Sequence, residues 1–268
     1  MHPVCHVYQV IQRKVHKLVS FLKLHTLIPK VGRKLSLSIA DALTYGLYWK
    51  KANLKTKKAL YELVEPPCSY KTFVVSLNRW SVVTAFILMA LLKVNRGNQH
   101  PVKHIDSTAI PVCKYRNRKH HRTMRLLAAV GHTGDGPFYG IKLHIISDLL
   151  GYLESLTFTS GNIPDRDPGT VQKLTKDIRG LLIGDAGYVS QKLAKLFNRT
   201  DRLLMVKPYK NMKKIATKLQ GLLYGTRMLI ERHFRCLKEF YGLVTSITRS
   251  VNCYLANYLY SILAYQLV

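Results

Sequence analysis

The order of patterns after Pro101 constrains the fold of this chain more than any other feature of its sequence. Three strand-like runs come first, the second and third with hairpin-like spacing, and helical and strand-like patterns then alternate. The predicted strands are residues 104–112, 138–148, 152–161, 181–185 and 203–209, and the predicted helices are residues 164–178, 189–199 and 218–241, followed by a C-terminal helix. This order predicts an α/β domain with helices layered against a sheet.

Residues 1–100 differ, because they contain helical patterns and no strand-like run. Ser38 is placed to cap one helix, with Asp41 in its first turn near the positive end of the helix dipole. Helices are predicted over residues 4–27, from residue 38 onward, over 55–63 and 69–80, and in the apolar run after Trp80. We therefore divide the chain into a helical region, 1–100, and an α/β domain, 101–268.

The charge balance limits the possible partners. The chain has 42 Lys or Arg and 14 Asp or Glu, a formal net charge of +28, which favours a polyanion. Nucleic acid is the leading candidate, ahead of an anionic membrane face or an RNA-packing role. The longest apolar run, Val82–Leu92, is shorter than the ~20 residues that cross a bilayer. We expect a soluble protein without a membrane partner.

Other patterns exclude further classes of protein. Charges scattered through the first residues argue against a secretory signal. The 5 cysteines form no C-x-x-C motif and no pairing pattern, which argues against a disulfide framework and a zinc site. These patterns predict a protein of a reducing compartment.

Acidic residues are scarce, so each can be considered individually. Asp106 lies inside the first predicted strand, where an ionised carboxylate is costly without a partner. Asp185 follows a short apolar run, at the predicted carboxyl end of a parallel strand, where open α/β sheets bind ligands. The functional hypothesis is a pair of metal ligands or a general base. The structural alternatives are a locally paired Asp106 and a turn-stabilising Asp185.

Glu231 lies on the last long helical pattern. At about 100° per residue, Tyr224, Arg227 and Lys238 fall within about 40° of it, forming a polar file beside an apolar stripe. The alternative is an ordinary ion pair of Glu231 with Arg227 or with Arg235. Because Gly225 weakens a helix, a helix that starts at Thr226, with Tyr224 on the preceding loop, is also an alternative.

Three carboxylates from two strands and a late helix suit phosphoryl transfer. Mg²⁺ prefers oxygen ligands, and two such ions about 4 Å apart can activate an attacking oxygen and stabilise a leaving one. We expect Asp106, Asp185 and Glu231 to converge on paired cations, with neighbouring Arg and Lys side chains contacting phosphate.

The late helix matches the signature Y-x2-R-x3-E-x6-K of bacterial insertion-sequence transposases of the DDE type, through Tyr224, Arg227, Glu231 and Lys238. The segment HIDSTAIPVCK around Asp106 resembles the first Asp block of this family, and LLIGDAGY around Asp185 resembles the second. The runs at 138–165 also resemble its second and third strands with their following turn. The similarity covers about residues 101–268, and the three blocks occur in the family's order and spacing.

The resemblance implies an RNase H-like α/β fold, a mixed sheet flanked by helices, preceded here by a small all-α basic region. It implies that Asp106, Asp185 and Glu231 are catalytic and bind two Mg²⁺ (or Mn²⁺) ions. Such enzymes cut DNA at element ends and join the 3′-hydroxyl to target DNA, which implies a homodimer in a synaptic complex and a cytoplasmic, nucleoid-associated bacterial location. The alternatives are an RNase H-like nuclease or resolvase and an inactive, domesticated DNA-binding derivative.

DNA contacts are expected in three places. By resemblance, the late helix contacts DNA near the scissile bond; a helix-turn-helix over 55–80 would read terminal inverted repeats; and the basic insertion 114–125 would follow a phosphate backbone. The alternatives for the last two are a basic helical bundle that covers one side of the core and a disordered basic loop. The predicted DNA-contacting residues are Tyr224, Arg227, Arg235, Lys238, Lys71, Arg79, Arg116, Arg118 and Lys119.

Overall fold

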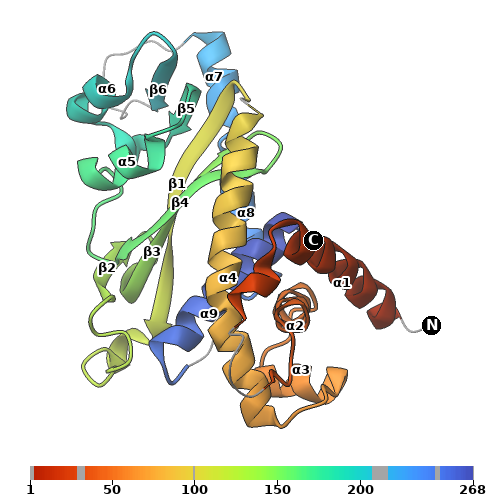
Figure 1. The fold of residues 1–268 in the computed structure, drawn as a ribbon. Helices are drawn as coiled ribbons and strands as arrows, with labels where there is room; N and C mark the ends of the chain where they lie inside the picture. The colour runs from red at the N-terminus through yellow and green to blue at the C-terminus, as the bar shows by residue number, and fades with distance from the viewer. Residues whose placement is uncertain (1–2, 29–33, 99, 207–216, 245–247, 268) are drawn as a thin grey trace. The chain divides into compact units, whose positions relative to one another are not determined.

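The computed structural model describes residues 3–28, 34–98, 100–206, 217–244 and 248–267 (Figure 1). The chain folds into two compact units. Unit 1 combines Met1–Met89 with Cys236–Val268, and unit 2 is Ala90–Arg235. From the sequence we expect a division at residue 100, whereas the first unit ends at Met89 and includes the C-terminal segment together with the N-terminal helices.

Unit 2 is built on a mixed sheet of six strands. The strands are β1 (Val102–Cys113), β2 (Ala129–Thr133), β3 (Gly136–Asp148), β4 (Leu153–Ser160), β5 (Gly180–Gly184) and β6 (Arg202–Val206). β3 pairs antiparallel with β1, β2 and β4, whereas β5 runs parallel to both β1 and β6. This mixed sheet, flanked by helices, confirms the predicted fold class.

Helix α5 (Pro168–Thr175) packs against β3, β4 and α6, and helix α6 (Gln191–Phe197) packs against β6 (Figure 1). Asp167 caps α5 as predicted, because its carboxylate accepts the backbone N–H of Thr170 at 2.8 Å and Pro168 takes the first position. Their apolar side chains and those of the strands form one buried cluster: Ile105, Ile146, Val171, Leu174, Ile178, Leu182, Tyr188, Leu193 and Phe197. This cluster makes one face of the sheet a rigid support for the residues on β1 and β5.

Strand β2 and its hairpin to β3 are not among the predicted elements. β2 pairs with the first residues of β3, from Ala129↔Gly140 to Thr133↔Gly136, and Gly136 turns the chain with a φ of 115°. Position 131 requires glycine, because a Cβ there would lie 2.2 Å from the carbonyl oxygen of Gly161. This glycine interrupts the alternation of apolar residues that would otherwise indicate a strand. A close backbone approach therefore hides this strand from a pattern-based prediction.

The single helix predicted over 218–241 is wrong, because the chain breaks at Thr226. α7 (Lys218–Gly225) ends there and α8 (Met228–Glu239) follows. Gly225 weakens a continuous helix by about 1 kcal/mol relative to Ala, and the Thr226 hydroxyl forms a 2.8 Å hydrogen bond with His104 Nε2 on β1. Tyr224 therefore lies in the last turn of α7 and does not belong to a continuous polar file with Glu231.

Unit 1 is helical. Its elements are α1 (Pro3–Phe21), a 3₁₀ turn (Leu24–Leu27), α2 (Ile39–Lys51), α3 (Lys57–Val64), the first part of α4 (Tyr70–Gly97), the end of α8 and α9 (Val251–Leu267). Ser38 caps α2 as predicted, accepting the Asp41 N–H at 3.0 Å. α2 is almost wholly buried and meets α9 closely, since a Cβ at Gly46 would lie 2.2 Å from the Tyr260 ring. The core of this unit therefore depends on a helix from each end of the chain.

Helix α4 joins two helices that the sequence predicts separately. It follows α3 after a turn, as expected, and continues from Tyr70 to Gly97. The apolar run Val82–Leu92, too short by itself to cross a bilayer, lies inside this longer helix, which is long and apolar enough to do so by length and composition alone. Within the helix, Phe73 and Leu77 are fully buried and Trp80 is 8% exposed. The helix is longer than either predicted helix because no helix-breaking residue lies near Trp80, where the two predicted helices meet.

Candidate active site

Asp106 lies on β1, on the face that meets the junction between α7 and α8. Residues two apart on a strand share a face, and both His104 and Asp106 contact that junction. His104 bonds to Thr226, and the Asp106 Oδ2 atom lies 3.3 Å from Nη1 of Arg227. Burial lowers the pKa of His104 to about 4, so its imidazole is neutral. The carboxylate of Asp106 on β1 therefore faces the residues that connect α7 to α8.

The environment of Asp106 favours its protonated form. Burial raises the pKa of its carboxyl group to about 7. The Ser107 backbone N–H, donating to Oδ1 at 2.7 Å, opposes this shift, while the negative charge of Asp185 adds to it. Asp185 follows β5, the strand that pairs with β1, so the two carboxylates belong to adjacent strands. A cation bound by both carboxylates would reduce the repulsion between their negative charges.

Asp185 comes directly after β5 and begins a short 3₁₀ turn (Ala186–Tyr188). Its Oδ1 atom accepts the Gly187 N–H at 2.8 Å, so it does stabilise its turn. β5 runs parallel to β1, with His104 opposite Ile183. Asp106 and Asp185 each come two residues after this pair, so they have equivalent positions along the two chain segments. The predicted parallel strand and its acidic end are therefore confirmed, and the turn-stabilising role coexists with proximity to Asp106.

The guanidinium of Arg227 binds two of the three predicted carboxylates. One terminal nitrogen contacts Asp106 at 3.3 Å, and the other bonds to Glu231 one helical turn later. Burial alone would lower the pKa of Arg227, but Asp106 and then Glu231 outweigh burial and raise it, with smaller contributions from Tyr224 and Asp185. The ion pair considered as an alternative for Glu231 is therefore formed, and it also includes Asp106.

The donor atoms fit a divalent cation in their chemistry. Carboxylate oxygens are the ligands that Mg²⁺ prefers, and Asp106 and Glu231 already share one cationic partner, Arg227. In the described ranges, however, no group of three or more His, Cys, Asp or Glu side chains is close enough to hold a metal ion. Arg227 and a metal ion would compete for the same oxygens, so chelation by all three carboxylates stays a prediction.

Two further residues belong to the site and were missed from the sequence. Asp165, in the turn after β4, accepts hydrogen bonds from Ser107 Oγ at 2.6 Å and Lys142 Nζ at 3.0 Å. Tyr188 is 1% exposed, and burial and then the Asp106 charge raise its pKa. Its hydroxyl has no hydrogen-bond partner within the described part of the chain. The only sequence feature that could have indicated Asp165 as a site residue is its place in an acidic turn directly after the third predicted strand.

The other predicted DNA-contacting residues are distributed over both units. Arg235 is exposed on α8 in unit 2, and Lys238 on the same helix is half-buried in unit 1. Unit 1 also contains Lys71 and Arg79, both exposed on α4. The insertion 114–125 forms a 3₁₀ turn (Tyr115–Asn117) and further turns in unit 2. There, Arg116 and Lys119 are exposed, and the Arg118 guanidinium lies 4.2 Å from the centre of the Tyr115 ring.

Comparison with known proteins gives the family. The family model described as "Transposase DDE domain" matches residues 96–251, which include Asp106, Asp185 and Glu231. The chain belongs to this family. The transposase is also similar to a piggyBac transposase seen in a cryo-EM structure of a synaptic complex with hairpin DNA. That similarity has a TM-score of 0.46 and 11% identity over 87% of this chain and 68% of the other. No curated protein matches the transposase in sequence.

Proposed function

We propose that this transposase cuts DNA at the ends of an insertion sequence and joins the freed 3′-hydroxyl to a target strand. In this proposal Asp106, Asp185 and Glu231 hold two divalent cations, Mg²⁺ or Mn²⁺. The observation that carries it is the contact of one guanidinium, that of Arg227, with both Asp106 and Glu231, while Asp185 follows β5, the strand next to that of Asp106. A fold that brings two of the few acids of a +28 chain to one cation, beside the acidic end of β5, has a site suited to positive charge.

Bound metal ions would activate the attacking oxygen and stabilise the leaving oxygen. The side chains have separate tasks. Asp106 must lose its proton to become a ligand, and with a pKa of about 7 it is poised to do so near neutral pH. The Ser107 N–H supports the ionised form. Arg227 has two terminal nitrogens, now on Asp106 and Glu231, that match two oxygens of a phosphate when those carboxylates are engaged elsewhere.

The substrate in this proposal is DNA, both the terminal inverted repeats of the element and the target. The excess of basic residues supports a polyanionic partner. We further propose that two copies act together in a synaptic complex, because two ends must be joined, and that they do so at the nucleoid of a bacterial cytoplasm.

A strand-transfer assay tests the proposal. Purified transposase is incubated with DNA carrying the element's ends, target DNA and Mg²⁺, and cleaved and joined products are measured separately. We expect Asp106→Asn, Asp185→Asn and Glu231→Gln each to reduce joining on the order of 10³-fold or more, with DNA binding changed less than about twofold. Glu239→Gln is the matched control, because Glu239 is an exposed acid on the same helix, α8.

Each other outcome has a distinct meaning. Full activity in any of the three variants would show that the site is assigned wrongly. Cleavage by the wild type without joining would identify a nuclease or resolvase. Binding of DNA without cleavage in any divalent metal would identify an inactive DNA-binding derivative.

A further inference from the structure

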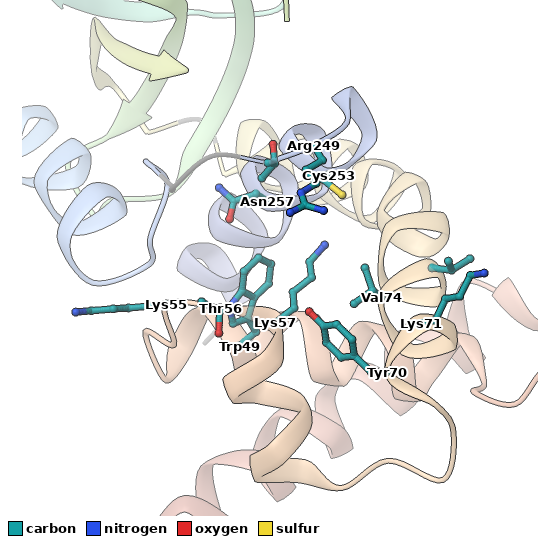
Figure 2. A pocket seen from close by; sticks show the side chains of 12 residues that line it. Trp49, Lys55, Thr56, Lys57, Tyr70, Lys71, Val74, Arg249, Cys253 and Asn257 are labelled. Carbon is teal, nitrogen blue, oxygen red and sulfur yellow. The ribbon is translucent and has the colours of Figure 1, made fainter. Parts of the chain in front are cut away.

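Unit 1 contains a pocket of about 580 Å³ that the proposed chemistry does not use (Figure 2). Its volume lies within the range of small-ligand sites, roughly 300–1,000 Å³. The residues come from α2, the start of α3, the start of α4, and α9 with the segment before it. They are Trp49, Lys55, Thr56, Lys57, Tyr70, Lys71, Val74, Val75, Thr248, Arg249, Cys253 and Asn257.

The charge of this pocket is entirely positive. Four of its lining residues are Lys or Arg, and none of those lining residues is Asp or Glu. Figure 2 shows the Lys57 ammonium and the Arg249 guanidinium directed toward one another across the pocket. Two cations that face each other without a carboxylate repel, and an anion between them removes that repulsion. The lining therefore favours an anionic ligand.

Lys57, which lines the pocket, and Lys50 beside it both donate hydrogen bonds to neutral groups. Lys57 donates to the Asn78 side-chain oxygen, and burial lowers its pKa. Lys50, 2% exposed, donates to the side-chain oxygen of Asn257 and to the Gly242 carbonyl oxygen at 3.2 Å. Both ammonium groups lie over the Trp49 ring, at 3.7 and 5.4 Å from its centre. Burial lowers the pKa of both ammonium groups, so an anion that enters the pocket would stabilise their charged forms.

An aromatic face lies beside these cations. Tyr70 is 43% exposed, and the edge-on packing of Tyr61, at 5.4 Å between ring centres, holds its ring in place. Val74 and Val75 continue the apolar wall. A cation pair next to a fixed, accessible aromatic ring matches the two parts of a nucleotide, because phosphate binds cations and a base stacks on an aromatic side chain.

We propose that this pocket binds an unpaired nucleotide of DNA, with its phosphate between Lys57 and Arg249 and its base against Tyr70. The choice of DNA as the polyanion rests on the proposed function. An exposed aromatic ring beside the cations favours an unpaired nucleotide over a duplex, since a base inside a duplex is covered by its neighbours and must leave the stack to contact Tyr70. A surface that only followed the duplex backbone would not need an exposed aromatic ring beside its cations.

Fluorescence anisotropy without divalent metal tests this proposal. The probes are a labelled single-stranded oligothymidylate of about ten nucleotides and a blunt duplex of the same length. We expect Tyr70→Ala to weaken binding of the single strand about tenfold and binding of the duplex less than twofold. Tyr70→Phe keeps the ring and should bind both probes as the wild type does. Tyr70 and Arg249 are exposed, so their replacement leaves the core intact, and a thermal melt verifies this.

The salt dependence of binding tests the phosphate contact. Arg249→Gln should lower the slope of log K against log salt for the single strand by about 0.7, the value for one phosphate contact. Lys58→Gln is the matched control, because Lys58 is an exposed cation on α3 that pairs with Glu62 and does not line the pocket. The proposal fails if Lys58→Gln has the same effect as Arg249→Gln, or if Tyr70→Ala weakens both probes equally.

The two proposals can fail separately. Asp106→Asn should bind the single strand as the wild type does, because its substitution is in unit 2. An inactive transposase whose single-strand binding still depends on Tyr70 would refute the proposed function alone. An active transposase whose single-strand binding ignores Tyr70 and Arg249 would refute the pocket alone.

Discussion

The Nη1 atom of Arg227 lies 3.3 Å from Oδ2 of Asp106. This ion pair joins the central strand of the sheet to the start of α8, and the same guanidinium binds Glu231. Arg227 therefore supplies from within the chain the positive charge that the carboxylates require. A divalent cation bound by Asp106 and Glu231 would take over that role and release Arg227.

Replacement of Arg227 should destabilise the transposase in a way that Mg²⁺ reverses. We expect Arg227→Gln to lower the free energy of unfolding by roughly 1–3 kcal/mol, because the largely buried carboxylate of Asp106 loses its cation. Saturating Mg²⁺ should restore most of this loss by binding the folded state. Urea denaturation with and without Mg²⁺ measures both effects, and Arg235→Gln, an exposed position on the same helix, should show neither. An equal loss in both conditions would show that these acids bind no metal.

Asp165 should act as a positioning residue for Asp106. It accepts the Ser107 hydroxyl at 2.6 Å, and the Ser107 N–H in turn donates to Asp106. We expect Asp165→Asn to reduce strand transfer about 10- to 100-fold and to raise the Mg²⁺ concentration needed for half-maximal activity. Asp201→Asn serves as the control, since Asp201 is half exposed and pairs with Arg179 at the surface. An unchanged Mg²⁺ requirement would argue against positioning.

Glu154 should make stability fall as the pH rises. Its side chain is 1% exposed, and burial raises its pKa from 4.5 to about 7, although Lys103, 3.6 Å away, opposes the shift. The folded state keeps this proton to higher pH than the unfolded state does. The stabilising contribution is therefore complete below about pH 4.5 and is lost as the pH rises through about 7.

The measurement is urea unfolding of wild type and Glu154→Gln across this pH range. Their difference in unfolding free energy should change by roughly 1–3 kcal/mol, with the wild type losing stability relative to the variant as the pH rises. The difference cancels the contribution of Asp106, which titrates in the same range. A difference that is constant with pH would contradict the shift, and the exposed Glu62→Gln variant should give that constant result.

The same substitution at two glycines should have opposite effects. A Cβ at Gly46 on α2 would lie 2.2 Å from the fully buried ring of Tyr260 on α9, whereas a Cβ at Gly221 on α7 meets nothing within 4 Å. We expect Gly46→Ala to cost about 1–3 kcal/mol through overpacking, and Gly221→Ala to add up to about 1 kcal/mol through helix propensity. Thermal melts should move in opposite directions. A rise in both would mean that α2 and α9 do not pack this closely.

Features that depend on neighbours in the chain were predictable from the sequence. The cap of α2 at Ser38 and the start of α5 at Asp167 follow from side chains that bond within three residues. The hairpin of β3 and β4 and the buried strand β5 follow from periodicity. The family follows from three acidic blocks, because their order and spacing are properties of the chain itself.

Tertiary contacts decided the rest. Thr226 ends α7 where its hydroxyl meets His104 of β1, and α9 groups with α2 through the ring of Tyr260. The ion pair of Arg227 with Asp106, added to its pair with Glu231, also joins distant parts of the chain. The hydrogen bond from Ser107 to Asp165 does the same. Local patterns carry helix propensity, caps and strand alternation, whereas ion pairs and close packing depend on which surfaces the folded chain brings within a few ångströms.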